Sequence, residues 1–263
     1  MDILKRKIAP ISEEAWQEID ETAVDVIKSI LSARMGLKLN GPKGWDYNAV
    51  PEGRLDVLED NEDGVSTGTY RLQRLVEARR SFVLNKWELD NIERGAENID
   101  LEPLEEAAEE LAIFEENLIF NGYEPAGIVG LSEAAEHQMT FGKEANTILK
   151  NIGNARYMLF NSYVQPPYDL FVSPEAYDRL NQIYQGSHLL KLVEKLIEGK
   201  VIRSKVVNGA VLIPHKHDDL ELTIGQDFSV GYEWDDKETV TLFITESLAF
   251  RVLDEAIIVN FKL

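Results

Sequence analysis

The first strong pattern in the chain is an apolar periodicity near the N-terminus, which predicts one helix over residues 12–35. Ser12 is a natural N-cap and Gly36 is a natural stop. The helix carries two adjacent apolar stripes, one with Trp16, Ile19, Ala23, Val26 and Ile30, the other with Val24, Ile27, Leu31 and Arg34. A helix that is apolar on two faces needs two partners. It is therefore either deeply buried, or packed on a core with one face while the other borders a groove.

Residues 45–80 alternate short apolar pieces with Gly, Pro, Asp and Asn, which predicts a long hairpin with a polar tip near Asn61–Gly64. A hairpin with so little core is marginally stable alone. The segment is either an ordinary surface hairpin or an arm that lies on another molecule.

A second long helix is predicted over residues 101–121, with Gly122 as its C-cap. Its apolar face comprises Leu104, Ala107, Ala108, Leu111, Phe114 and Leu118, and much of the rest is Glu105, Glu106, Glu109, Glu110, Glu115 and Glu116. The patterns that follow predict a helix over 143–162, a buried strand over 168–173, a helix that begins after Ser173, a helix over 189–198 and a β-rich remainder over 200–263. Together these elements predict an α+β fold.

Charge and composition narrow the class of protein. The chain has 27 Lys and Arg against 47 Asp and Glu, a net charge of −20. Nucleic-acid binding needs clustered basic residues, so the charge disfavours that partner. The absence of cysteine excludes disulfides and thiolate metal sites. No apolar run approaches the roughly 18 residues of a membrane span, and the N-terminus lacks the apolar region of a signal peptide. We therefore expect a cytoplasmic protein with no membrane partner.

Candidate chemistry is sparse. GxSxG, P-loop and GxGxxG motifs are absent. His215, His217 and Asp219 alternate along HKHDD and are the best metal candidates, but they fall at an expected turn between two strands, where a solvated polar turn is the simpler interpretation. The glutamates of 101–121 lack the Glu-x-x-His pairs of a di-iron site. The sequence predicts neither an enzyme nor a metal site.

Two linked segments, WELDNIERG (87–95) and DLEPLEEAAEELAIFEENLIFNG (100–122), the latter followed by GIVGL (127–131), resemble encapsulin shell proteins. The other matching blocks, in order along the chain, are LKRKIAP (4–10), GPKGWDY (41–47), GQDFSVGYE (225–233) and LFITESLAFRV (242–252). The resemblance spans nearly the whole chain, and the order and spacing of the blocks are specific.

The resemblance implies the Hong Kong 97-type fold of tailed-phage major capsid proteins. Its expected parts are an N-terminal helix and segment (1–44), an extended loop or hairpin arm (45–80), a peripheral domain with a long spine helix (81–129 and 216–263) and an apical domain (130–215).

The implied function is that of a shell subunit that self-assembles into a closed icosahedral nanocompartment, the T=1 60-mer. The shell would enclose a cargo enzyme for iron storage or oxidative-stress defence. That cargo would be a separate protein with a targeting peptide, such as a ferritin-like protein or a dye-decolourising peroxidase. One alternative is a tailed-phage major capsid protein, which the acidic charge and the direct start at LKRKIAP disfavour. The other is a bacteriocin or protease-like enzyme, which would need a nucleophile and base that the sequence does not offer.

The resemblance also implies three sites. The residues of a cargo-peptide groove would be Ile27, Leu31, Arg34, Asp227, Val230, Tyr232 and Phe250. The residues of a loop that lines the five-fold pore would be Tyr184, Gln185, Gly186, Ser187 and His188. Trp87 could stack a flavin whose phosphate Arg79 serves, although no cofactor is required and the alternative role of Trp87 is an anchor at a subunit contact.

Overall fold

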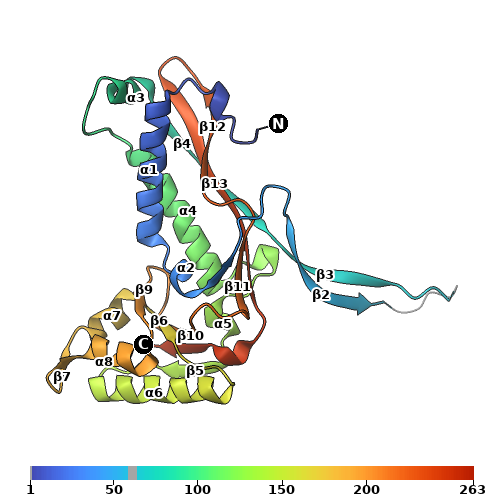
Figure 1. Ribbon diagram of the computed structural model, residues 1–263, viewed down its shortest axis with the longest axis vertical. Coiled ribbons are helices and arrows are strands. Elements are labelled where there is room, and N and C mark those ends of the chain that lie inside the picture. Colours follow the sequence, from blue (N-terminus) through green and yellow to red (C-terminus); the bar gives the residue numbers. More distant parts are fainter. Residues whose placement is uncertain (1, 59–63) are drawn as a thin grey trace.

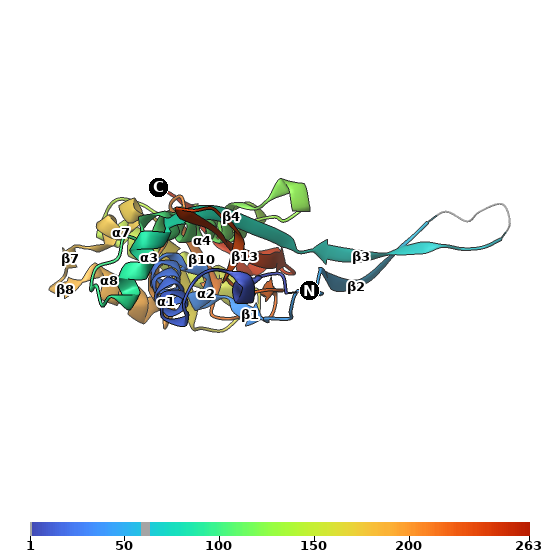
Figure 2. The ribbon, with the colours of Figure 1, turned by 90° about the horizontal axis from the view of Figure 1, so that it is seen from above.

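The computed structural model describes residues 2–58 and 64–263, which form a flat body with a hairpin arm that projects from one side (Figures 1 and 2). The body has two parts, each built on a five-stranded sheet. The buried apolar side chains form two clusters, one within the first part and one around the second sheet that also takes in residues of the first sheet, such as Leu222 and Phe250. The expected α+β class is therefore confirmed, with helices packed on both sheets.

The first sheet is organised around one long strand, β13. Its strands are β1 (Lys38–Asn40), β4 (Val76–Asn85), β11 (Leu220–Ile224), β12 (Ser229–Asp235) and β13 (Thr239–Val252). β4, β11 and β12 all pair antiparallel with β13, and β1 pairs in parallel with β11. β13 is buried along the whole of its middle, whereas β4 alternates between buried and exposed residues toward its C-terminal end. β13 is therefore the structural centre of the sheet.

Three helices pack on this part: α1 (Glu13–Ile30), α3 (Lys86–Glu93) and α4 (Glu102–Asn121). Figure 1 shows α1 and α4 side by side along the body. Trp16, Ile19 and Ala23 of α1 share one buried cluster with Leu104 and the first half of the predicted apolar face of α4. The predicted apolar faces of both helices are thus the faces that pack, and Gly122 is the C-cap of α4 as predicted.

The second sheet has the order β5-β14-β10-β6-β9. Its strands are β5 (His137–Thr140), β6 (Tyr168–Val172), β9 (Val201–Arg203), β10 (Ala210–Pro214) and β14 (Val259–Lys262), with α6 (Ala145–Asn161), α7 (Pro174–Leu180) and α8 (Leu189–Ile197) packed around them. Every residue of β6 is buried, as predicted. The Ser173 hydroxyl accepts a hydrogen bond from the Ala176 N–H at the start of α7, also as predicted. The segment 216–263, expected in the peripheral domain, supplies its last strand, β14, to this second sheet.

The body also contains the short helical segments η1 (Arg6–Ile8), η2 (Glu124–Ala126), α5 (Leu131–Ala134) and η3 (Glu255–Ile257). Within residues 2–58 and 64–263, no helix combines the length and the apolar character that a membrane crossing requires.

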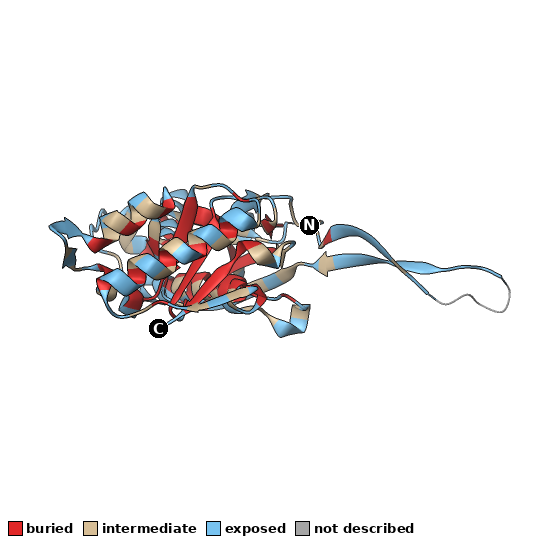
Figure 3. Ribbon diagram, turned by 90° about the horizontal axis from the view of Figure 1, so that it is seen from below, coloured by how far each residue is buried: buried red, intermediate tan, exposed pale blue. Residues whose placement is uncertain are grey.

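The arm is a two-stranded hairpin of β2 (Ala49–Val57) and β3 (Gly68–Arg74), which confirms the hairpin predicted within residues 45–80, whereas residues 76–80 belong to β4 of the first sheet. Figure 3 shows that both strands are exposed along most of their length, in contrast to the buried body. Large apolar side chains are among those exposed, namely Leu55, Val57, Tyr70 and Leu72. Of the predicted tip Asn61–Gly64, residues 61–63 lie outside the described part of the chain. An arm with exposed apolar side chains and no body beneath it is suited to contact another molecule.

Candidate functional site

A shallow groove of about 410 Å³ runs along α1 and the short helix α2 (Ala33–Gly36). It is lined by Val24, Ile27, Lys28, Leu31, Arg34, Met35, Asp227 and Phe228. Val24 is 43 % exposed and Met35 is 49 % exposed. The groove therefore offers accessible apolar side chains with charged groups beside them, which is the pattern that binds an extended peptide.

Four of the seven residues predicted for the cargo groove line it together: Ile27, Leu31, Arg34 and Asp227. The other three do not line it. Val230 is buried in the core beneath the groove, and Tyr232 packs against the same core while its hydroxyl donates to Asp235.

Phe250 lies on β13 and belongs to the buried cluster around the second sheet, where it is 1 % exposed. The residues predicted for the groove also lack Val24, Lys28, Met35 and Phe228, although Val24 belongs to the predicted second stripe of the helix. Helical spacing from Ile27 and Leu31 points to the first two. Phe228 follows Asp227 directly in the chain but lies in the loop before β12. The alternation of side chains along a strand therefore could not identify it as a groove residue.

The prediction of one helix over 12–35 is wrong at residues 31–32. α1 ends at Ile30, Leu31 has extended backbone angles, and α2 begins at Ala33. The cause is the Glu116 carboxylate of α4. The Ser32 N–H and the Ala33 N–H donate to its Oε1 at 2.8 Å and 2.7 Å.

The Glu116 carboxylate also accepts a hydrogen bond from the Ser32 hydroxyl, and the Ser204 hydroxyl donates to its Oε2 at 3.2 Å. A side chain distant in sequence thus supplies the acceptors that start a new short helix. The break turns α2 away from the axis of α1 and places Arg34 and Met35 at the end of the groove.

Two glutamates of α4 that were expected on its polar surface are buried. Glu115 is 0 % exposed and Glu116 is 1 % exposed. Burial raises the pKa of Glu116 above its ordinary value, against the hydrogen bonds from Ser32 and Ala33, which lower it. Both carboxyl groups have strong local partners, which explains how they are tolerated in the interior.

Arg34 is the partner of Glu115 and the centre of a buried charge cluster. Its Nε and Nη2 donate to the two Glu115 oxygens at 2.8 Å and 2.6 Å, and its Nη1 donates to Asp227 Oδ1 at 2.9 Å. Glu246 of β13 lies 3.4 Å from Nη2. Burial alone would lower the pKa of Arg34, but the hydrogen bond and charge of Glu115, with the charges of Glu246 and Asp227, raise it, so the guanidinium stays charged.

Glu246 is 1 % exposed, and its pKa is raised well above the ordinary value by burial and by the neighbouring Glu115. Both causes disfavour the charged form of the Glu246 carboxyl group, which lies beside the Glu115 carboxylate. Together, the carboxyl groups of Glu115, Glu246 and Asp227 surround the guanidinium and fix Arg34 at the floor of the groove.

The predicted pore loop is a tight exposed hairpin. β7 (Ile183–Tyr184) pairs with β8 (Ser187–His188), and Figure 1 shows β7 at an outer corner of the body. The two turn residues, Gln185 and Gly186, have φ of 50° and 80°. Positive φ at both central residues is the signature of a type I′ hairpin turn, for which glycine is favoured. The loop thus projects polar side chains from a rigid two-residue turn.

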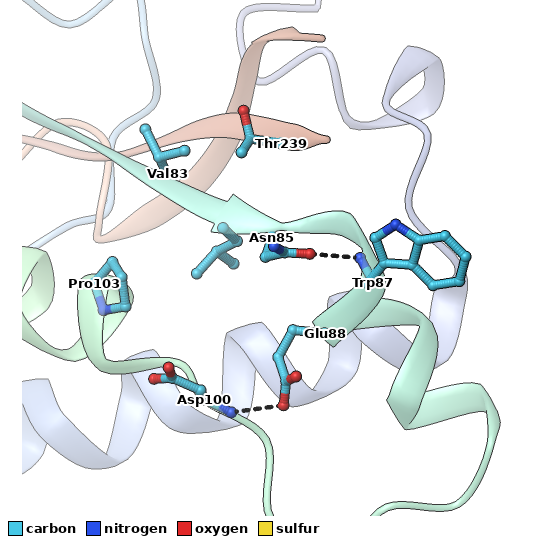
Figure 4. A pocket seen from close by; sticks show the side chains of 8 residues that line it. Val83, Asn85, Trp87, Glu88, Asp100, Pro103 and Thr239 are labelled. Atoms are coloured by element: carbon cyan, nitrogen blue, oxygen red, sulfur yellow. Dashed lines mark hydrogen bonds between the residues drawn. The ribbon is translucent and has the colours of Figure 1, made fainter. Parts of the chain in front are cut away.

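Trp87 and Arg79 do not form one flavin site within a subunit. Trp87 is 67 % exposed at the start of α3, and Figure 4 shows its indole at one end of a pocket that Val83, Asp100 and Pro103 also line. Arg79 lies six positions before Asn85 on β4, which is about 20 Å of extended chain. Its guanidinium stacks 4.0 Å from the ring centre of Phe243, so the residues of one chain do not fit a shared ring and phosphate site.

HKHDD forms the turn between β10 and β11, as predicted. His215 Nδ1 lies 2.6 Å from the buried Asp169, whereas His217 lies 3.5 Å from Asp219. The two imidazoles have different partners. Among the residues that the structure describes, no group of three or more His, Asp or Glu is arranged to hold a metal ion.

Comparison with known families identifies the chain. Residues 1–249 match the family described as "Encapsulating protein for peroxidase". The chain is 36 % identical to the type 1 encapsulin shell protein of Rhodospirillum rubrum, over 96 % of this chain and 94 % of the relative. It is 31 % identical to the type 1 encapsulin shell protein of Mycobacterium tuberculosis, over 95 % of each chain.

Solved structures show the same fold at low sequence identity. A virus-like particle from Pyrococcus furiosus matches with a TM-score of 0.71 and 18 % identity, over 93 % of this chain and 98 % of the other. The capsid of the Myoviridae phage XM1 matches with a TM-score of 0.62 and 12 % identity, over 89 % of this chain and 92 % of the other. The predicted phage-capsid fold is confirmed. The relatives are named as shell proteins rather than enzymes, and the chain belongs to the encapsulin shell protein family.

Proposed function

We propose that this chain assembles into a closed icosahedral shell of the smallest class, the T=1 60-mer, in the cytoplasm, and that the shell encloses a cargo enzyme. The observation that carries the proposal is the arm. β2 and β3 expose Leu55, Val57, Tyr70 and Leu72 with no body beneath them (Figure 3). A neighbouring copy that covers these side chains makes a heterologous contact, and such contacts close into a shell when their rotations match a point group.

Size-exclusion chromatography with negative-stain microscopy tests this assembly. The expected result is a uniform hollow particle. A monomer or dimer at physiological salt contradicts the proposal. The electrostatic self-repulsion of a chain with a net charge of −20 weakens as salt screens it, so assembly is expected to improve between 50 mM and 300 mM salt.

The cargo is proposed to be a peroxidase or a ferritin-like protein with a terminal targeting peptide. The family description, which names encapsulation of a peroxidase, supports the first of these. The peptide is proposed to bind in an extended form in the groove beside α1. Leu31 and Val24 offer apolar contacts for alternate side chains, and the charged Arg34 and Asp227 fix the direction of the peptide.

The variant Leu31→Asp tests the groove. Leu31 is half-buried and lies after the end of α1, so an aspartate there can reach solvent in the empty shell, whereas docking of an apolar peptide would bury the new charge. We expect assembled but empty shells on co-expression with the cargo. Leu31→Met preserves the size and apolar character of the residue and is the matched control, with normal loading expected. Normal loading in Leu31→Asp would exclude this groove.

The type I′ hairpin at Gln185 and Gly186 is proposed to line the five-fold pore, since a rigid exposed turn at a corner of the body suits a ring of five copies. A flavin site that involves Trp87 stays a prediction, and it requires groups from a neighbouring copy because Arg79 lies too far along β4.

A further inference from the structure

A second cavity, larger than the groove, opens on the other side of the end of α1. Its volume is about 650 Å³, against about 410 Å³ for the groove. Its walls come from both parts of the body: Ser29 and Ile30 at the end of α1, Tyr177 of α7, Leu190 of α8, and the strand β9 with Arg203. Met35 of α2 lines both the groove and this cavity. The two spaces are therefore adjacent and share Met35 as a wall.

The groove alone is short for a targeting peptide. The part of the groove that follows α1 runs from Val24 to Leu31, the residue just after the helix, which is about 10 Å along the helix axis. An extended peptide covers that length with about three residues. A tail that gains specificity from more residues needs a further surface, and the second cavity is the adjoining one.

The second cavity contains a cation without an ion-pair partner among the described residues. Arg203 is exposed, and its guanidinium is held 4.8 Å from the centre of the Tyr177 ring. The nearby Lys205, in contrast, is engaged by Glu109 at 2.6 Å. Two carboxylates line the cavity, Asp178 and Glu194, and the Val201 N–H donates to Glu194 at 3.5 Å; neither carboxylate forms an ion pair with Arg203 among the described residues. Arg203 is thus positioned on an aromatic wall and is available to a carboxylate.

We infer that the cargo peptide extends past Met35 into the second cavity, where a carboxylate of the peptide pairs with Arg203 beside Tyr177. This inference rests on the proposed binding of a cargo peptide in the groove. The carboxylate is either an acidic side chain or the free C-terminus of the tail, since a guanidinium binds both in the same way. The walls of the cavity are firm, because the Ser204 hydroxyl donates to Glu116 at 3.2 Å and the Ser204 N–H donates to the Val172 carbonyl at 3.0 Å.

The test compares loading of a reporter into shells. The reporter is a fluorescent protein fused to the terminal peptide of the cargo that co-purifies with the native shell, identified first by mass spectrometry. Arg203→Gln removes the charge and keeps much of the side-chain volume. Arg94→Gln is the matched control, because Arg94 is also exposed and also lies over an aromatic ring, at 5.6 Å from the Trp87 ring centre, and it lines neither cavity. Leu31→Asp reports on the groove itself.

We expect Arg203→Gln to reduce the apparent affinity for the reporter about tenfold, as for the loss of one partly buried ion pair, and Arg94→Gln to load normally. Replacing the acidic side chains of the tail by their amides, or adding two glycines after its last residue, distinguishes the two sources of the carboxylate. Whichever of these two changes lowers loading into unmodified shells should cause no further loss of loading into Arg203→Gln shells.

Normal loading of Arg203→Gln, with loss of loading in Leu31→Asp, would overturn this inference and leave the proposed function standing. Normal loading of both would remove the groove as well. Effects of Arg203→Gln and of the tail changes that simply add would show that they are not partners and would also overturn the inference. Loss of shells in Arg203→Gln would mean that a neighbouring copy fills the cavity, with the same consequence.

Discussion

Glu116 decides where the N-terminal helix ends, and replacing it by alanine or by glutamine separates its hydrogen bonding from its volume and charge. In Glu116→Ala, the Ser32 and Ala33 N–H groups lose their acceptor in a buried place. Each buried donor without a partner costs about 1–3 kcal/mol, so the two together cost about 4 kcal/mol.

Glu116→Gln retains most of these interactions. Both backbone donors reach the same oxygen, Oε1, so one amide oxygen serves both. The amide NH₂ then faces the Ser32 and Ser204 hydroxyls, which can rotate to accept. A cost of about 1 kcal/mol is expected, as for the exchange of one charged hydrogen bond for a neutral one.

Hydrogen–deuterium exchange of the segment 31–37 measures this difference directly. A local gap of about 3 kcal/mol between the two variants corresponds to roughly 150-fold faster exchange in Glu116→Ala. Glu110→Ala, on the same helix, is the control, because its partner Arg80 is at 2.5 Å but both side chains are more than half exposed, at 56 % and 55 %. Such a surface pair contributes little. Equal exchange rates in Glu116→Ala and Glu116→Gln would refute the assignment of the helix break to this carboxylate.

Three other predictions concern pH, assembly and permeability. The folded-state pKa of Glu246 is raised above its ordinary value of 4.5, so its contribution to stability is complete below that value and is lost as pH rises through the folded pKa, by about 1.4 kcal/mol per pH unit. The melting temperature of Glu246→Gln should therefore depend less on pH above 5 than that of the unmodified protein. Parallel curves of melting temperature against pH for the two proteins would contradict this prediction. Deleting residues 56–68 should abolish or alter assembly and leave a folded subunit by circular dichroism, whereas shells of unchanged size and heat resistance would mean that the arm has another role. Replacing Gln185 or His188 by Gly, Asp or Lys should change the rate at which small ions enter the shell, because short loops select by diameter and charge, and constant stopped-flow uptake rates would place the entry route elsewhere.

The elements of this fold follow closely from local sequence patterns. The apolar periodicity of α4, the cap at Ser173 and the continuous apolar run of β6 each have one local cause that the chain itself displays. The hairpin arm follows from turn residues around short apolar pieces. The arrangement of the two sheets has no local signature in the sequence. It could be predicted only from the ordered blocks that resemble encapsulins.

The helix break and the charge cluster have no local cause. The acceptor for the Ser32 N–H lies 84 positions away in the sequence, and Glu246 lies 212 positions from Arg34. Glutamates 115 and 116 have the composition of a solvated face, so periodicity assigns them to solvent, and only their partners explain their burial. The groove prediction failed at Phe250 for a related reason, whereas Leu31 and Asp227 do line the groove. The blocks that resemble encapsulins identify whole segments, but the face to which a side chain of β13 points depends on the register of β13 against β11.

The two buried glutamates of α4 together explain how the groove keeps its shape without help from a ligand. Consecutive residues on a helix point about 100° apart. Glu115 accepts hydrogen bonds from Arg34, and Glu116 accepts them from Ser32 and Ala33. One turn of α4 therefore binds both ends of the segment 32–34. Arg34, the last residue of that segment, lines the groove, and the next residue, Met35, lines both the groove and the second cavity. The geometry of the groove is therefore fixed from beneath by buried carboxylates, whereas its apolar specificity depends on exposed side chains such as Val24. Substitutions of the exposed set can change which peptide binds without loss of the fold, and substitutions of the buried set should affect binding only by loosening the segment that both glutamates hold.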